Sequence, residues 1–313
     1  MPITVVGSIA YDAVQTPFGE RERMLGGAAV HFALAASLFD EVRVVGPVGD
    51  DFAEEDLEVL RHRGIDVGDI ERVPGETFFW RGEYGWDLNT RETLDTKLGV
   101  FEGFQPKLSE RSRASEMLFL ANIQPELQSQ VRAQLPDARF VALDSMNLWI
   151  DIARDSLVSA IRGVDCLVLN DAELRQLTVK PNLISAAREV LSWPPAEQGA
   201  RRPSVIVAKQ GEYGAALITR EGFFALPAYP LETVIDPTGA GDTFAGGLVG
   251  YIAAHRDRAI SDDLLRAAMA HATVLASFNV EEFGTERLQR LTREELDARL
   301  GELRAITQFS ELG

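Results

Sequence analysis

The residues best suited to carry out chemistry lie in the segment 236–247, which reads DPTGAGDTFAGG. Its closely spaced glycines lead into an apolar pattern of helical period, predicted to cover 240–254. Glycine lets the backbone turn sharply and approach a ligand closely. The first turn of a helix offers unpaired N–H groups and a positive dipole end to an anion such as a phosphate. Asp242 falls in that turn, where its carboxylate could accept the proton of a hydroxyl that attacks a bound phosphoryl group.

Three other interpretations compete with a phosphate site. Asp242 could be only a helix N-cap, which is a common role for Asp. The glycines could serve only a tight connection from strand to helix, or the loop could belong to another nucleotide-binding class. It is not a P-loop, since no Lys follows the glycines, and not a dinucleotide-binding loop, since Phe244 occupies the third glycine position. From these residues alone, the phosphate site, the N-cap and the tight connection all stay open.

Short apolar runs and amphipathic stretches alternate along most of the chain. Runs rich in Val, Ile, Leu and Phe are typical of buried parallel strands, and the stretches between them have helical periodicity. This alternation predicts an α/β fold with a central, mostly parallel sheet and helices on both faces. The predicted strands cover 3–6, 42–45, 117–120, 140–143, 166–169 and 205–208. The predicted helices cover 28–38, 54–62, 152–161, 184–191, 240–254, 262–278 and 294–306.

One region, 76–101, departs from this pattern. It is dense in aromatic, Thr and charged residues and lacks helical periodicity, and turn signals stand at Gly82, Gly85 and Asn89. These features predict strands. We expect a small β lid on an otherwise single domain spanning 1–313, because such excursions often cover a site or an interface. The segment 193–203, rich in proline, is predicted to be a surface loop.

The composition limits the classes of function. A net charge of −17 argues against non-specific binding to nucleic acid or to an anionic membrane. Cys166 is the only cysteine, so no intrachain disulfide can form. No apolar stretch approaches the ~18 residues of a membrane span, and the start of the chain does not have the pattern of a signal peptide. A cytoplasmic location is the default expectation.

The segment DPTGAGDTFAGG resembles the C-terminal signature of the ribokinase-like, or PfkB, carbohydrate kinases. The resemblance extends over nearly the whole chain. It includes GSIAYD at 7–12, LGGAAVHFALAASLF at 25–39, NDAE at 170–173 and AKQGEYGAAL at 208–217. It implies a ribokinase-like three-layer fold, with Asp12 at the end of the first strand. It also implies an ATP-dependent kinase that uses Mg²⁺ and phosphorylates a hydroxymethyl-type hydroxyl of a sugar or sugar derivative.

The resemblance also implies a role for individual residues. Asp242 is the implied base, and the amides of Gly239, Ala240 and Gly241 form the implied anion hole. The remaining implied residues are Asp12, Gly26, Gly27 and His31 for the acceptor, Asn170, Glu173, Lys209 and Gly211 for phosphate or nucleotide, Glu173 for Mg²⁺ through water, and Asp236 with Thr238 for a monovalent cation such as K⁺.

Several of these residues have a simpler reading. Asn170 and Glu173 could be only a helix-capping pair, His31 only a packed side chain, and Lys209 only a solvated one. His31 stands where the family usually has Asn, and Ala28 stands where the ribose-type members have Lys. These two differences argue against plain ribose as the acceptor.

The identity of the acceptor stays open at this point. A nucleoside such as adenosine, inosine or guanosine is an alternative, since the lid aromatics could cover a nucleobase. A catalytically silent binding or regulatory protein with the same fold is a second alternative. The same aromatics could also form a subunit contact, and we expect a homodimer through the lid. They are Phe78, Phe79, Trp80, Tyr84 and Trp86.

Overall fold

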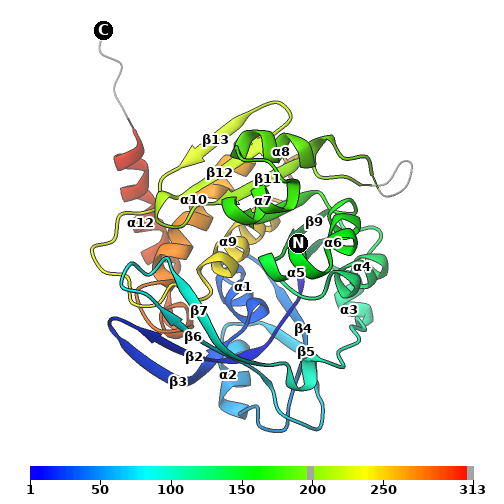
Figure 1. The fold of residues 1–313 in the computed structure, drawn as a ribbon, viewed down its shortest axis with the longest axis vertical. Coiled ribbons are helices and arrows are strands. Elements are labelled where there is room, and N and C mark those ends of the chain that lie inside the picture. Colours follow the sequence, from blue (N-terminus) through cyan, green and yellow to red (C-terminus); the bar gives the residue numbers. More distant parts are fainter. Residues whose placement is uncertain (196–200, 309–313) are drawn as a thin grey trace.

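The computed structural model describes residues 1–195 and 201–308. Its centre is a sheet of nine strands in the order β13-β12-β11-β10-β9-β8-β1-β4-β5 (Figure 1). Neighbouring strands are parallel from β11 to β5, and β12 and β13 are antiparallel additions at one edge. The strands are β1 (Ile3–Val6), β4 (Val42–Val48), β5 (Asp66–Arg72), β8 (Met117–Leu120), β9 (Phe140–Asp144), β10 (Cys166–Asn170), β11 (Val205–Lys209), β12 (Ala215–Thr219) and β13 (Phe223–Leu226).

Helices cover both faces of this sheet. Because side chains alternate along a strand, Val168 of β10 enters one core and its neighbours Leu167 and Leu169 enter the other. One core lies under α1, α9 and α10, and the other lies under α4, α6, α7 and α8. The helices are α1 (Ala28–Ala36), α2 (Glu54–His62), α3 (Glu110–Arg113), α4 (Pro125–Gln134), α5 (Asn147–Ile152), α6 (Arg154–Ile161), α7 (Asp171–Thr178), α8 (Leu183–Ser192), α9 (Ala240–Ala254), α10 (Asp262–Asn279), α11 (Glu286–Arg290) and α12 (Arg293–Thr307).

A second sheet of four strands, here called the lid sheet, has the order β3-β2-β6-β7. Two of its strands, β6 (Phe78–Tyr84) and β7 (Arg91–Lys97), fall in the predicted excursion. The other two, β2 (Ala10–Thr16) and β3 (Gly19–Gly26), come from near the start of the chain, and β2 runs parallel to β6. The lid is therefore built from two distant segments, although only one of them was expected.

Two predictions about the lid are wrong in detail. Asp12 does not end the first strand, since it lies inside β2 of the lid sheet, where it pairs with Trp80. Gly82 is not a turn residue, because it lies within β6 next to a register shift between β6 and β7. The chain turns instead between the two strands, where Gly85 N donates to Thr90 O over 2.9 Å.

The remaining predicted elements can be compared directly. All six predicted strands and all seven predicted helices are confirmed, with differences of a few residues at their ends. Residues 196–200 of the predicted loop lie outside the described residues, and the flanking residues 193–195 and 201–204 belong to no helix or strand. Within the part of the chain that the structure describes, no helix combines the length and apolar character needed to cross a membrane.

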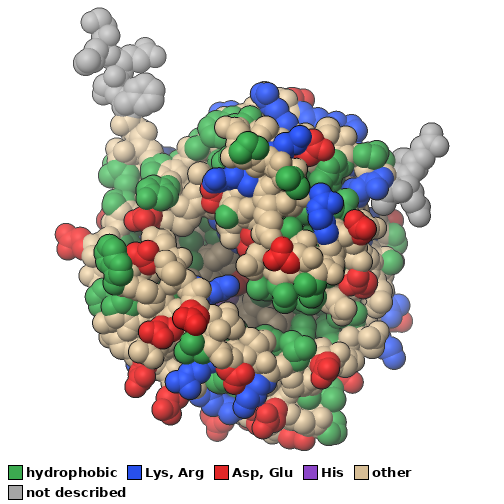
Figure 2. All heavy atoms as spheres, in the orientation of Figure 1, with side chains coloured by type: hydrophobic (Ala, Val, Ile, Leu, Met, Phe, Trp, Pro, Cys, Tyr) green, Lys and Arg blue, Asp and Glu red, His purple; other side chains and the backbone are tan. Residues whose placement is uncertain are grey.

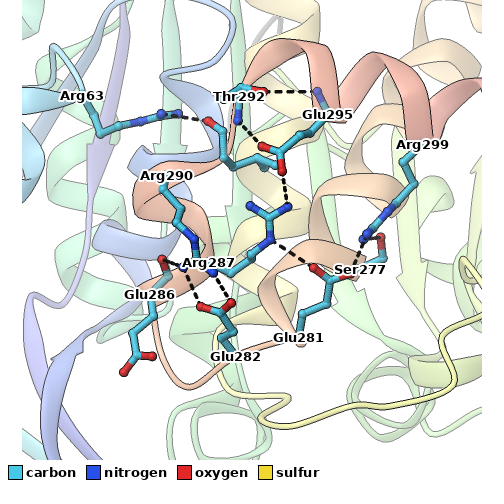
Figure 3. A network of polar contacts seen from close by, with 11 residues as sticks. Arg63, Ser277, Glu281, Glu282, Glu286, Arg287, Arg290, Thr292, Glu295 and Arg299 are labelled. Atoms are coloured by element: carbon cyan, nitrogen blue, oxygen red, sulfur yellow. Dashed lines mark hydrogen bonds and ion pairs between the residues drawn. The ribbon is translucent and has the colours of Figure 1, made fainter.

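A network of ion pairs joins the end of α10 to α11 and α12 (Figure 3). Arg287 contacts Glu281 over 3.1 Å and Glu295 over 2.7 Å, and its guanidinium lies 4.7 Å from the centre of the Phe278 ring. Glu295 also completes a capping box with Thr292 at the start of α12. These contacts fix the loop between α10 and α11, which carries Phe283 and Gly284 toward the start of α9.

Candidate active site

The segment 236–242, here called the anion loop, leads into α9. Gly239 is the N-cap of the helix, with a left-handed φ of 75°. Asp236 fixes the loop, because its Oδ1 accepts from Thr238 N and its Oδ2 from Gly284 N, both over 2.9 Å. Asp242 lies in the first turn, and no side chain caps the helix. Gly239 and not Asp242 is the N-cap, so the N-cap reading of Asp242 is wrong.

The surroundings of Asp242 favour a proton acceptor that works near neutral pH. Burial raises the pKa of this carboxyl group, the charge of Asp144 raises it further, and the ammonium of Lys209 opposes both effects. A carboxylate whose pKa is raised in this way accepts a proton more readily than an ordinary Asp. Figure 2 shows a hollow near the centre of the face that carries α9 and the lid sheet.

Polar side chains stand at the carboxyl ends of three adjacent strands. Asp144 ends β9, Asn170 ends β10 and Lys209 ends β11. Lys209 Nζ lies 3.1 Å from Asp144 Oδ2, so this Lys is paired rather than merely solvated. The sequence analysis singled out Lys209 and missed Asp144, whose only signal was its place directly after a buried run.

Asn170 and Glu173 form a capping box at the start of α7. Asn170 Oδ1 accepts from Glu173 N over 2.7 Å, and Glu173 Oε2 accepts from Asn170 N over 2.9 Å. Burial raises the pKa of Glu173, and the charge of Lys209 opposes the rise. These two hydrogen bonds confirm the interpretation of Asn170 and Glu173 as a helix-capping pair. They hold two oxygen-bearing side chains at the same edge as Lys209, and the role in metal binding stays a prediction.

Asp12 is buried and packs against the loop before α1. A Cβ on Gly26 would lie 2.0 Å from Asp12 Oδ2, so only glycine fits there. Gly27 is the N-cap of α1 with a φ of 96°, and its backbone N–H donates to the Asp12 carboxylate. Burial raises the pKa of Asp12 to about 7, and repulsion by Asp236 and Asp242 adds to the rise. The lid sheet thus places a buried carboxyl group, whose ionisation is unfavourable, close enough to Asp242 for their negative charges to repel each other.

This raised pKa predicts a pH effect on stability. The pKa of Asp12 is about 7 in the folded protein against an ordinary value of 3.8, so this carboxyl group ionises less readily in the folded than in the unfolded chain. The free energy of unfolding therefore falls as the pH rises from about 4 to about 7, and the stability present at low pH is lost. We expect Asp12→Asn to stabilise the ligand-free protein, relative to wild type, more at pH 8 than at pH 4, by roughly 1–3 kcal/mol. Chemical denaturation at both pH values measures the difference. The exposed Asp257→Asn is the control, and a difference independent of pH for Asp12→Asn would contradict the assignment.

His31 packs against the anion loop at Gly239. Its Nδ1 lies 2.9 Å from Asn279 Oδ1, and a Cβ on Gly239 would lie 2.3 Å from its ring. Asn279 in turn donates to Thr238 O over 2.7 Å and accepts from Thr243 Oγ1 over 2.9 Å. Burial lowers the pKa of His31 to about 4, so the ring is neutral. The packed reading of His31 fits these contacts, while its Nε2 has no partner among the described residues.

A cavity of about 610 Å³ adjoins the other side of the anion loop. Gly211 and Ala240, both singled out from the sequence, lie in its wall, beside the apolar Phe244 and Val280. The tip of the lid hairpin closes another side with Trp86, Leu88 and Asn89. A second, more open cavity of about 660 Å³ lies between α8 and the β12–β13 turn, and none of the predicted site residues lines it.

Side chains of the β6–β7 hairpin contact the body near the site. Tyr84 and Thr238 bring their hydroxyls within 3.2 Å, and Asn89 Nδ2 donates to Glu212 Oε1 over 3.1 Å. Arg91, at the start of β7, is close enough to Asp242 to lower the pKa of that carboxyl group. From the sequence, Tyr84 was expected only as one of the lid aromatics, and Arg91 only as a lid charge at the rim or toward the substrate. Their proximity to Thr238 and Asp242 was not predicted, since no local pattern connects the lid to α9.

Comparison with known proteins agrees with this arrangement. The family described as pfkB family carbohydrate kinase matches residues 107–290. A cytidine kinase of Thermococcus kodakarensis is 29% identical over 258 residues, which cover 80% of this chain and 88% of the relative. A ribokinase of Lactococcus lactis is 25% identical over 308 residues, covering 91% and 92%. A solved fructokinase from Vibrio cholerae, with fructose, ADP and potassium bound, superposes with a TM-score of 0.77 at 18% identity, covering 96% of this chain and 98% of that one.

Proposed function

The chain belongs to the pfkB family of carbohydrate kinases, and from this premise we propose that it transfers the γ-phosphoryl group of ATP to a hydroxymethyl-type hydroxyl of a sugar unit. The protein is a sugar or nucleoside kinase, a phosphotransferase with an alcohol acceptor. The observation that carries the proposal is the position of Asp242. It lies in the first turn of α9, with the anion loop beside it and Asp12 within electrostatic range.

Each part of the site has a proposed task. Asp242 accepts the proton of the attacking hydroxyl, and the amides of Gly239, Ala240 and Gly241 stabilise the charge of the phosphoryl group in transfer. Asp12 accepts hydrogen bonds from acceptor hydroxyls and so orients them. The 610 Å³ cavity has the size of a ligand pocket and receives the nucleotide.

Magnesium fits the edge that carries Asn170 and Glu173. Both side chains offer oxygen, which is the ligand type that Mg²⁺ prefers, and Mg²⁺ commonly keeps several waters. The same edge holds the carboxylates of Asp144 and Glu173, whose charges repel each other. We propose that Asn170 and Glu173 hold the ion through water and that the bound ion neutralises phosphate charge.

A nucleoside is the acceptor that the lid favours. Asp12 and Trp80 are partners on neighbouring strands, so their side chains lie on the same face of the lid sheet. An aromatic ring beside the residue that orients the sugar suits a planar base attached to that sugar. The 29% identity to a cytidine kinase supports this choice, and a free sugar is the second candidate.

A panel of acceptors tests the proposal. ATP consumption is measured with ribose, fructose, cytidine, adenosine, inosine and guanosine, and we expect the nucleosides to be consumed fastest. Trp80→Ala should raise the KM of the nucleoside without changing that of a free sugar, and Phe79→Ala, on the opposite face of β6, is the matched lid control. Activity on free sugars alone would refute the nucleoside proposal. No activity on any acceptor would favour a silent binding protein.

A monovalent cation is proposed beside the anion loop. Asp236 and the carbonyl of Thr238 stand at the place that the family resemblance indicates, and the Vibrio fructokinase holds potassium. Both groups already accept hydrogen bonds from backbone or Asn279, so a cation would share them.

We expect potassium to raise kcat relative to tetramethylammonium at equal ionic strength. The physical reason is that a bound cation would hold the anion loop and oppose the buried charge of Asp236. The rate of ATP consumption at saturating acceptor measures the effect. An unchanged rate after the swap would remove the cation from the proposal.

We expect a homodimer formed through the lid. The lid sheet ends in two unpaired edges, β3 and β7, and exposed edges are templates for pairing. Leu94 of β7 is 46% exposed and Trp86 is 89% exposed. Light scattering should report about twice the chain mass of 34.4 kDa.

A variant pair tests where the dimer forms. Leu94→Arg should yield a monomer, whereas Ile152→Arg on α5, outside the lid, should leave the dimer intact. A wild-type monomer at micromolar concentration would instead assign the lid aromatics to the body or to the ligand.

A further inference from the structure

Asp144 and Lys209 form a buried ion pair at the edge of the main sheet that carries the proposed site. Their side chains are 6% and 19% exposed, and Nζ and Oδ2 lie 3.1 Å apart. The other carboxylate oxygen of Asp144 accepts from Ser145 N over 2.8 Å. Gln128 Nε2 donates to the backbone carbonyl of Asp144, also over 2.8 Å. Asp144 is thus held in place independently of the Lys.

The ammonium of Lys209 lies against the backbone of the anion loop. A Cβ on Gly241 would lie 2.8 Å from Nζ, so the glycine leaves room for the ammonium beside the amides that are proposed to bind phosphate. Asp144, Glu173 and Asp242 all raise the pKa of Lys209. The ammonium of Lys209 therefore stands among three carboxylates, next to the place where the phosphoryl group would pass.

A purely structural ion pair would need no such position. Buried pairs add little net stability, since desolvation offsets their attraction. The chain contains a half-buried pair at Asp165 and Arg201, whose side chains are 21% and 24% exposed. Asp165 precedes β10, at the edge of the sheet opposite to the one where Asn170 ends the strand. The Asp144–Lys209 pair differs because its cation contacts the anion loop.

We propose that Asp144 is a positioning residue that holds the ammonium of Lys209 over the anion loop, where Lys209 contacts the phosphoryl group during transfer. This inference rests on the proposed kinase activity. The Lys side chain is long and flexible, and two other carboxylates compete for it. Without Asp144 the ammonium would turn toward Glu173 or toward Asp242, and pairing with Asp242 would weaken the base.

Three variants test the proposal in the full-length protein. Lys209→Met should lower kcat by roughly 10²-fold, as expected for loss of one stabilising group. Asp144→Asn should lower kcat by about 10-fold or more, with the acceptor KM within about two-fold of wild type. The double variant should be no slower than Lys209→Met alone, because the two residues act as one unit.

Asp165→Asn is the matched control. It removes a half-buried carboxylate from a pair at the opposite edge of the sheet, so kcat should stay at the wild-type value while the melting temperature falls. If Asp144→Asn does not fold, Asp144→Glu keeps the charge and displaces the ammonium by one methylene, and a reduced kcat is again expected.

The pH profile separates positioning from mere stability. The charges that act on Asp242 come from Asp144, Lys209 and Arg91, and Asp12 lies within electrostatic range of it. Asp144→Asn removes a negative charge, so the acid limb of kcat/KM should move to lower pH. Lys209→Met removes a positive charge, so the limb should move to higher pH. The control should leave the limb in place.

Each outcome has a clear meaning. A kcat for Asp144→Asn within two-fold of wild type, or additive losses in the double variant, would overturn the proposal while leaving the kinase intact. Acid limbs that move in the same direction in both single variants would also overturn it. A wild-type protein that consumes no ATP with any acceptor would instead refute the proposed function.

Discussion

Asp242→Asn is expected to lower kcat by about 10²–10⁴-fold, the usual effect of removing a general base. The amide of Asn cannot accept the hydroxyl proton, although it nearly matches the shape of the carboxylate. Nucleotide affinity should be retained, because Asp242 does not line the 610 Å³ cavity. Turnover is measured by ATP consumption at saturating acceptor, and nucleotide binding by thermal shift.

The fold of the Asp242→Asn protein should remain intact. Burial raises the pKa of Asp242, so its ionised form is unfavourable in the folded state and a neutral amide removes that cost. Asp165→Asn again supplies a control, in which a half-buried carboxylate outside the site is replaced. Wild-type turnover in the purified variant would show that Asp242 is not the base.

Asp12→Ala is expected to weaken the acceptor by ~1.5–3 kcal/mol, the range for hydrogen bonds to a charged group. This corresponds to roughly a 10-fold to 150-fold rise in the acceptor Kd. Nucleotide affinity should not change, because Asp12 lies in β2 and takes no part in the wall of the 610 Å³ cavity proposed for the nucleotide. Calorimetric titration of each substrate measures the two effects separately.

A control for Asp12→Ala lies in the same sheet. Glu20, at the start of β3, is exposed, and Glu20→Ala should leave both affinities at their wild-type values. An equal loss of affinity for acceptor and nucleotide in Asp12→Ala would point to general damage of the lid. An unchanged acceptor Kd would remove Asp12 from the site.

The central sheet was predictable because its strands are buried on both faces. Such strands are continuous apolar runs, as in 166–169, and a run of this kind can be recognised without knowledge of its partners. The helix at 240–254 was predictable for the same local reason, and its N-terminal glycines identified the anion loop. The predicted helix also places Asp242 in its first turn. The predicted strand at 205–208 places Gly211 just beyond its end, where it lines the cavity.

Strands β2 and β3 of the lid sheet, and the pairing inside the site, were not predictable in the same way. Strand β3 reads GERERMLG and is mostly exposed, so it lacks the alternation that marks a half-buried strand. Strand β2 finds its partner β6 more than sixty residues away, and nothing near Asp12 in the sequence indicates that contact.

Side-chain roles depended on non-local contacts as well. Lys209 could be solvated or bound to phosphate as far as its neighbours in sequence show, and only the fold brings Asp144 to it. Asn170 and Glu173 satisfy the pattern of a capping box and the pattern of the family motif with the same atoms. Local spacing therefore identifies such residues but does not assign their chemistry.

The β6–β7 hairpin forms part of two walls at once. Its tip, with Trp86, Leu88 and Asn89, borders the 610 Å³ cavity proposed for the nucleotide, while Trp80 of the same hairpin lies beside Asp12. If either substrate orders the hairpin, the entropy of ordering is lost once, on binding of the first ligand. The two substrates then bind cooperatively. Thermodynamic linkage requires the coupling free energy to be the same whichever substrate binds first. The factor by which nucleotide tightens the acceptor must equal the factor by which acceptor tightens nucleotide.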